Sequence, residues 1–134
     1  MNGSIKEISP IEAWEILGSD KDSVLVDVRT SDEIKALGSV DLTSFIKNVV
    51  FIPWINDLIS RDVNENFLTD LEKLVPNKGA KIVFMCKAGR RSFDAAMVAE
   101  KGGYNSCFNL TTGFGQGVGD SGWKSMKLAC KEYV

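Results

Sequence analysis

A cysteine that follows an apolar run and precedes a basic loop is the strongest chemical feature of this sequence. The run KIVFM at 81–85 predicts a buried strand, and Cys86 comes directly after it. The residues that lead on into a predicted helix are Lys87, Ala88, Gly89, Arg90, Arg91 and Ser92. A thiol at the start of a helix faces backbone N–H groups without helical partners, and the helix macrodipole adds partial positive charge. With three cationic side chains in the same loop, this environment favours the thiolate and predicts a nucleophile at Cys86.

Gly89 gives the loop the freedom to curl, so that successive backbone amides point inward and form a cradle for an anion. The alternative interpretation is a buried structural cysteine whose basic neighbours face water. That interpretation leaves the crowding of cations in a short strand-to-helix turn unexplained. We therefore expect Cys86 to be catalytic. Cys107 and Cys130 lack a basic loop, and we expect them to be packing residues in a strand and in a helix, respectively.

Two absences narrow the chemistry. Histidine is missing, and the three cysteines are too far apart to form a Cys-x-x-Cys pair. This excludes a Ser-His-Asp triad, a Cys-His nucleophile pair, imidazole zinc sites and a dithiol redox motif. We expect neither a metal nor another cofactor. Scattered cysteines in odd number also argue against a disulfide framework and suit a reducing compartment.

Apolar patterning and helix caps divide the chain into alternating strands and helices. Capping-box patterns start at Ser9 and at Thr30, where Glu33 is the reciprocal member, and each predicts a helix. The predicted strands are 24–26 (ending at Asp27), 49–52, 81–85 and 107–110. The predicted helices are 10–18, a short one after Thr30, 64–75, 92–101 and 123–133, with a glycine-rich loop at 113–122.

Strands that are apolar on both faces and alternate with helices predict an α/β fold. We expect a single domain over 1–134, with its core at about 5–130, built on a mainly parallel twisted sheet with helices on both faces. Ligands bind such sheets beyond the carboxyl ends of the strands, where Cys86 lies and where Asp27 and Arg29 also lie. Asp27 and Arg29 share one face of an extended segment. We expect them to pair with each other or with Arg91 and so brace the loop, or else to contact the substrate.

Composition excludes several other functions. Sixteen basic and eighteen acidic residues give a net charge of −2, without the positive excess typical of nucleic-acid-binding proteins. No apolar run approaches the ~20 residues that cross a bilayer, and residues 1–10 lack the pattern of a secretory signal. We therefore expect a cytoplasmic protein without a nucleic-acid or membrane partner. The glycines of 113–122 fit neither a dinucleotide-binding nor a phosphate-loop motif, and predict a flexible loop beside the site.

The Cys86 loop resembles that of the rhodanese (thiosulfate sulfurtransferase) family, whose single-domain members carry Cys-Arg/Lys-x-Gly-x-Arg-Ser. The similarity extends to VLVDVRT at 24–30, to a strand ending in Ile-Pro, and to GGY, FNL and GF within 102–114. It covers roughly residues 5–130. The chain departs from the family at 37–41, where LGSVD stands in place of Gly-His-Ile and a small-residue turn, and the stretch 38–48 is rearranged.

The resemblance implies a double displacement at Cys86. The thiolate attacks the outer sulfur of thiosulfate or another small anionic sulfur donor, sulfite leaves, and a cyanide, thiol or protein acceptor then removes the sulfur from the Cys86 persulfide. Within this scheme we expect Lys87 and Arg90 to contact the donor. Arg91 would shape the loop from its far end, and Ser92 would cap the helix.

Two other functions stay open. A phosphatase or arsenate reductase on the same fold is disfavoured, because tyrosine phosphatases place the arginine six positions after the cysteine. Here Ser92 holds that position, and Arg91 comes one residue earlier. A non-enzymatic or persulfide-relay module is disfavoured by the intact cysteine and its basic loop.

Overall fold

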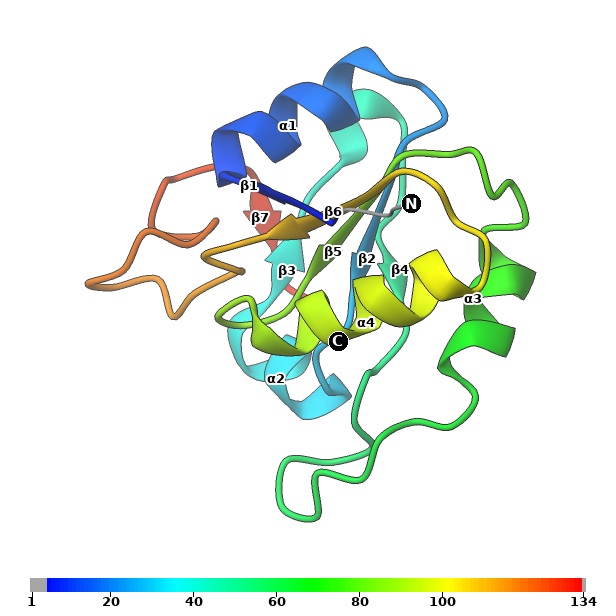
Figure 1. Ribbon diagram of the computed structural model, residues 1–134. Helices are drawn as coiled ribbons and strands as arrows, with labels where there is room; N and C mark the ends of the chain where they lie inside the picture. The colour runs from blue at the N-terminus through cyan, green and yellow to red at the C-terminus, as the bar shows by residue number, and fades with distance from the viewer. Residues whose placement is uncertain (1–4, 134) are drawn as a thin grey trace.

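A five-stranded parallel sheet forms the centre of the computed structural model, which describes residues 5–133 (Figure 1). The strand order is β1-β6-β5-β2-β4. The strands of this sheet are β1 (Lys6–Ile8), β2 (Val24–Asp27), β4 (Val50–Phe51), β5 (Ile82–Met85) and β6 (Cys107–Leu110). A second sheet pairs β3 (Ser39–Val40) with β7 (Cys130–Lys131). The helices are α1 (Pro10–Ser19), α2 (Ser31–Leu37), the 3-10 helix η1 (Thr43–Phe45), α3 (Phe67–Leu74) and α4 (Arg90–Lys101).

Two apolar layers cover the two faces of this sheet. One layer joins α3 and α4 to the sheet through side chains such as Leu71, Ala95 and Phe84. The other joins α1 and the C-terminal segment to the opposite face through Leu17, Val83 and Trp123. Because both faces of β5 are covered, all four of its residues are buried, which explains why its sequence is apolar without alternation. The predicted α/β fold, mainly parallel and with helices on both faces, is confirmed.

Strand register brings the segment of Asp27 and Arg29 and the segment that starts at Cys86 to the same edge of the sheet. β2 and β5 are parallel neighbours, and Asp27 pairs with Met85 across them. Arg29 and Cys86 therefore follow two adjacent strand ends, as expected for ligand sites in parallel sheets. Both predicted capping boxes are present: the Ser9 hydroxyl accepts from the Glu12 amide at the start of α1, and the Thr30 hydroxyl accepts from the Glu33 amide at the start of α2.

The prediction of a helix over 123–133 is wrong. The chain forms turns after Trp123 and then enters β7, so that Cys130 lies in a strand and not in a helix. Trp123 is fully buried, and its indole N–H donates to the Ala129 carbonyl at 2.9 Å, which curls the segment back on itself. Lys127 has a left-handed backbone (φ 61°), which a continuous helix cannot contain.

Other differences concern element ends and short strands. The helix expected over 64–75 begins only at Phe67, and the helix expected from Ser92 begins at Arg90. The sequence patterns do not predict β1 and β3, which are three and two residues long and owe their structure to pairing with β6 and β7, respectively. Within residues 5–133, none of the helices is long and apolar enough to span a membrane.

The rearranged stretch 38–48 is fastened to α1 by one lysine. The ammonium of Lys47 donates to the carbonyls of Leu17 and Asp20 and to the Ser23 hydroxyl, at 2.7 to 2.8 Å. Two of these acceptors are carbonyls at the C-terminal end of α1, where a cation is favourable. Lys47 therefore joins the 38–48 stretch to the end of a helix far from it in sequence.

We expect Lys47→Met to lower the free energy of unfolding by about 1–3 kcal/mol, because it removes the three hydrogen bonds that the ammonium donates to the Leu17 and Asp20 carbonyls and to the Ser23 hydroxyl. Urea unfolding followed by circular dichroism measures this change. Lys21→Met, at an exposed position of the same turn, serves as the matched control and should leave the midpoint unchanged. Equal midpoints for the two variants would contradict the anchoring role of Lys47.

Candidate active site

Two hydrogen-bond donors point at the Cys86 sulfur. The Gly89 amide lies 3.1 Å from Sγ, and the Ser92 hydroxyl lies 3.2 Å from it. Cys86 is only 1% exposed, at the end of β5. The predicted cradle of several amides is smaller than expected, since among the described residues one backbone N–H reaches the sulfur. The hydroxyl of Ser92 supplies the second donor.

Gly89 meets two demands that exclude a side chain. Its φ of 97° lies in the left-handed region, which glycine adopts without strain. A methyl group at this position would also collide with the backbone carbonyl of Thr111, just after β6. Gly89 therefore lets the start of α4 approach β6 closely while its N–H faces Cys86.

The expectation that Ser92 caps the helix is wrong. The N-cap of α4 is Gly89, and Ser92 lies within the first turn of the helix. Its buried hydroxyl is within hydrogen-bond distance of Cys86 Sγ and, at 2.6 Å, of Asn109 Oδ1. A hydroxyl has one proton and can also accept, so Ser92 connects the cysteine to Asn109.

The glycine-rich loop holds the cysteine loop through two backbone hydrogen bonds. The Phe114 amide donates to the Cys86 carbonyl at 2.8 Å, and the Gly115 amide donates to the Lys87 carbonyl at 2.9 Å. Gly113, between β6 and these contacts, has no room for a Cβ beside the carbonyls of Cys86 and Lys87. The segment 113–122 thus lies beside the site, as the sequence predicts.

Arg91 forms a two-point ion pair with Glu33, which holds the far end of the loop. The guanidinium donates to Oε1 at 2.8 Å and to Oε2 at 2.9 Å. Burial raises the pKa of Glu33, but hydrogen bonds from Arg91 and from the Thr30 backbone outweigh it and lower the pKa from 4.5 to about 2. The same pairing raises the pKa of Arg91. Glu33 thus has two roles, the predicted cap at Thr30 and an ion pair that the sequence analysis did not foresee.

Asp27 and Arg29 pair with each other, which selects one of the alternatives left open by the sequence. Two hydrogen bonds of 2.7 and 3.0 Å join their buried side chains. Asp27 also accepts from the Ser39 hydroxyl, while Arg29 donates to the Gly38 carbonyl. The Arg29 guanidinium stacks on Phe114, with Cζ 4.3 Å from the ring centroid. Because Phe114 also holds the Cys86 carbonyl, Arg29 supports the loop indirectly.

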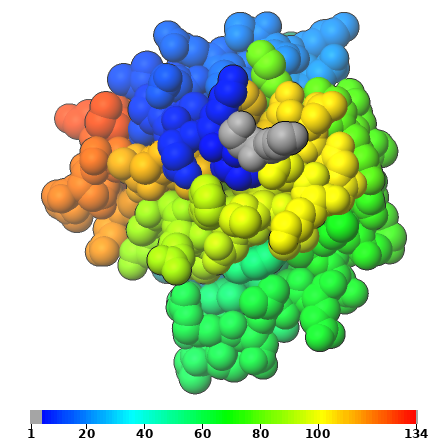
Figure 2. Space-filling view, viewed as in Figure 1, coloured from blue at the N-terminus to red at the C-terminus, as the bar shows by residue number. Residues whose placement is uncertain are grey.

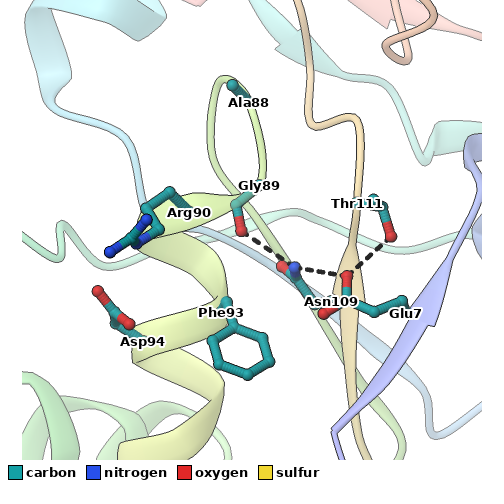
Figure 3. Close-up of a pocket in the computed structure, with 8 residues that line it drawn as sticks. All are labelled: Glu7, Ala88, Gly89, Arg90, Phe93, Asp94, Asn109 and Thr111. Atoms are coloured by element: carbon teal, nitrogen blue, oxygen red, sulfur yellow. Dashed lines mark hydrogen bonds between the residues drawn. The ribbon is translucent and has the colours of Figure 1, made fainter.

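Two cavities flank the cysteine loop, and they separate Lys87 from Arg90. A cavity of about 410 Å³ lies next to α2 and is lined by Asp32, Glu33, Ala36, Leu37, Leu58, Arg61, Lys87 and Arg91. A cavity of about 580 Å³ lies between β1, β6 and α4 and is lined by Glu7, Ala88, Gly89, Arg90, Phe93, Asp94, Asn109 and Thr111 (Figure 3). The two cations expected to contact one donor therefore face different cavities. Cys86 lines neither of the two.

Three residues at the site were missed from the sequence. Arg61 belongs to the segment between β4 and α3, which projects from the body of the molecule (Figure 2). Asn109 is a polar residue inside the apolar strand β6, and that contrast was a usable signal. Glu7 carried no signal, because β1 itself was not predicted.

The other two thiols differ from Cys86 in their surroundings. Burial and the nearby Glu100 carboxylate raise the pKa of Cys107 to about 12, so this thiol stays neutral near pH 7. Burial also raises the pKa of Cys130, against the nearby cations Lys124 and Arg29.

Fold and site together define a class of protein with a cysteine loop at the carboxyl edge of a parallel sheet. The model of the rhodanese-like domain family matches residues 9–119, and the chain belongs to this family. The uncharacterized protein RC0915 of Rickettsia conorii is 34% identical over 125 residues, which are 93% of this chain and 96% of that protein. The family resemblance seen in the sequence is thereby confirmed.

Solved structures agree with this assignment. The crystal structure of Rv0390 from M. tuberculosis has a TM-score of 0.86 and 31% identity, covering 98% of this chain and all of that one. The polysulfide-sulfur transferase homodimer of Wolinella succinogenes has a TM-score of 0.70 and 22% identity, covering 96% of this chain and 80% of that one. The human single-domain sulfurtransferase TSTD1 has a TM-score of 0.58 and 20% identity over 83% of this chain and 93% of that one. At these lower identities, the last two support the fold.

We expect Glu33→Gln to be less stable than wild type at pH 7, by a difference that shrinks as the pH falls. Because pairing lowers the pKa of Glu33, its stabilising effect is complete above about 4.5 and is lost as the pH falls toward about 2. Urea unfolding of both proteins between pH 2 and 7 measures the difference. The exposed Glu15→Gln on α1 is the control. A wild-type advantage over Glu33→Gln that stays constant across this range would refute the ion pair as its source.

Proposed function

We propose that this chain is a sulfurtransferase that accepts a sulfane sulfur on Cys86 and passes it to a nucleophile. The main support is the Cys86 sulfur itself, which has two donors aimed at it from Gly89 and Ser92 and cations on both sides of its loop. The Gly89 amide is fixed before the reaction and stabilises an anionic sulfur without reorganisation, and the Ser92 hydroxyl supplies a second donor by turning its proton to the sulfur. Membership of the rhodanese-like family and the sulfurtransferases of the same fold support the same class of reaction.

Thiosulfate is the donor we propose. The Cys86 thiolate forms an S–S bond to the outer sulfur, and the bond between the two thiosulfate sulfurs breaks, so that sulfite leaves with that electron pair. Cys86 is then a persulfide. Cyanide or a thiol attacks the terminal sulfur of this persulfide, and the electron pair of the broken S–S bond returns to Cys86 as the thiolate.

The donor enters, on this proposal, from the cavity lined by Lys87 and Arg61. Three cations and two carboxylates line that cavity, and Arg91 and Glu33 among them neutralise each other. The cavity on the Arg90 side has two carboxylates, Glu7 and Asp94, for its one cation. A dianion is therefore attracted to the Lys87 side more than to the Arg90 side.

A phosphatase or arsenate reductase is the second candidate from the sequence. Arg91 lies at the end of the loop, and both of its hydrogen bonds to Glu33 use guanidinium N–H groups that a phosphate would need. This pairing disfavours a phosphatase. A persulfide relay to a protein acceptor would use the same first step and differ only in the acceptor.

Incubation with thiosulfate should add one sulfur atom, ~32 Da, to the wild-type chain, because the Cys86 thiolate becomes a persulfide. Intact-mass spectrometry detects the addition, and cyanide should reverse it. Cys86→Ser should take up no sulfur, whereas the matched variant Cys130→Ser should load as wild type does. Loading of Cys86→Ser would contradict the assignment. Hydrolysis of p-nitrophenyl phosphate without any sulfur loading would favour the phosphatase.

Lys87→Met should raise KM for thiosulfate about fivefold, the size expected when one partly exposed attraction of about 1 kcal/mol is lost, with a smaller effect on kcat. Arg90→Met, on the other cavity, should raise KM less. Steady-state kinetics with cyanide as acceptor measures both. A larger effect of Arg90→Met than of Lys87→Met would move donor entry to the Arg90 side.

A further inference from the structure

Asn109 contacts both residues that lie within hydrogen-bond distance of the Cys86 sulfur, Gly89 and Ser92. It lies on β6 and is 2% exposed. Its Nδ2 donates to the Gly89 carbonyl at 3.0 Å, and its Oδ1 accepts from the Ser92 hydroxyl at 2.6 Å. Gly89 and Ser92 are the two residues whose N–H and O–H face Sγ. One buried amide thus fixes both sides of the sulfur's hydrogen-bonding environment.

Glu7 determines which way the Asn109 amide is turned. The Glu7 carboxylate accepts from Asn109 Nδ2 at 2.9 Å and from the Thr111 hydroxyl at 2.8 Å (Figure 3). The Glu7 carboxylate and the Gly89 carbonyl can only accept, so the NH₂ group of Asn109 must face both. Oδ1 is then left facing Ser92.

We propose that Asn109, oriented by Glu7, is a positioning residue for Cys86. It keeps the Gly89 backbone and the Ser92 side chain in place, so that the sulfur meets donors already aimed at it. This inference rests on the proposed function for its kinetic consequence, but its effect on the reactivity of Cys86 can be measured without any sulfur transfer.

The hydroxyl of Ser92 makes the arrangement suited to two states of the sulfur. With a neutral thiol, Ser92 accepts from the S–H group and donates to Asn109 Oδ1. With an anionic thiolate or persulfide, the same hydroxyl turns its proton from Asn109 Oδ1 to the sulfur, while the NH₂ group of Asn109 stays held by Glu7 and the Gly89 carbonyl. Both states therefore keep a donor or acceptor within reach, and the loop does not have to move.

The decisive experiment compares iodoacetamide labelling of the three cysteines in Asn109→Ala and in wild type, by peptide mass spectrometry at pH 7.5. We expect Cys86 labelling to slow about tenfold, the factor for the loss of one well-aimed hydrogen bond to a charged group. Cys130 serves as the internal reference. Burial raises the pKa of Cys107 and keeps its thiol neutral, so a rise in its labelling reports unfolding. In the thiosulfate–cyanide assay, kcat should fall by a similar factor with KM within twofold of wild type.

Variants of Glu7 keep the proposal testable if Asn109→Ala is unstable. Glu7 is exposed, and Glu7→Ala removes the acceptor of Asn109 Nδ2 and of the Thr111 hydroxyl without touching Gly89 or Ser92, so Cys86 labelling should slow about threefold, for a contact of about half that strength. Glu7→Gln retains an acceptor and should restore the wild-type rate. Asn105→Ala, at an exposed position in the loop before β6, is the matched asparagine control.

Unchanged or faster Cys86 labelling in Asn109→Ala would overturn the proposal, and so would equal slowing in Glu7→Ala and Glu7→Gln. A rise in KM at constant kcat would overturn the kinetic part, because it would place Asn109 in donor binding. If the wild-type chain takes up no sulfur from thiosulfate, the proposed function fails by itself. The labelling ratio of Cys86 to Cys130 then still decides the role of Asn109.

Discussion

The close approach of the start of α4 to the end of β6 is the constraint on which the site depends. Gly89 stands at this approach, against the Thr111 carbonyl and with a backbone conformation that a side chain would strain. Because Gly89 has no side chain, the start of α4 can lie against the end of β6. In this position the Gly89 amide reaches the Cys86 sulfur and the Gly89 carbonyl reaches Asn109. Gly89 therefore forms the turn into α4, donates to the Cys86 sulfur and accepts from Asn109 on β6.

Two ion pairs support the cysteine loop, and they differ in how far their charged groups are removed from water. Asp27 and Arg29 are buried, and contacts with Ser39, the Gly38 carbonyl and the ring of Phe114 reduce the cost of desolvating their charges. Arg91 and Glu33 are partly exposed and join the loop to α2. Of the cations in the cysteine loop, Arg91 is paired with Glu33, and Lys87 and Arg90 line the two cavities.

The stretch in which the chain departs from the family pattern is tied into the same support. Gly38 and Ser39 contact the buried Asp27–Arg29 pair, and Val40 pairs with Cys130 in the small second sheet. Lys47 fastens the end of the stretch to α1. The altered segment is thus joined to the site through polar contacts with the buried Asp27–Arg29 pair, and not through contacts with the Cys86 sulfur.

The sequence by itself determined the features that depend on neighbours along the chain. The apolar runs that form β2, β5 and β6, the capping boxes at Ser9 and Thr30, and the basic loop after Cys86 all follow from local patterns. Only the tertiary structure decided the rest: the short strands, the turns after Trp123, and the contacts of Arg91 with Glu33 and of Asn109 with Glu7. These pairs are 58 and 102 residues apart, so they form only when separate strands and helices pack together, and no local pattern records which distant partner a polar side chain will meet.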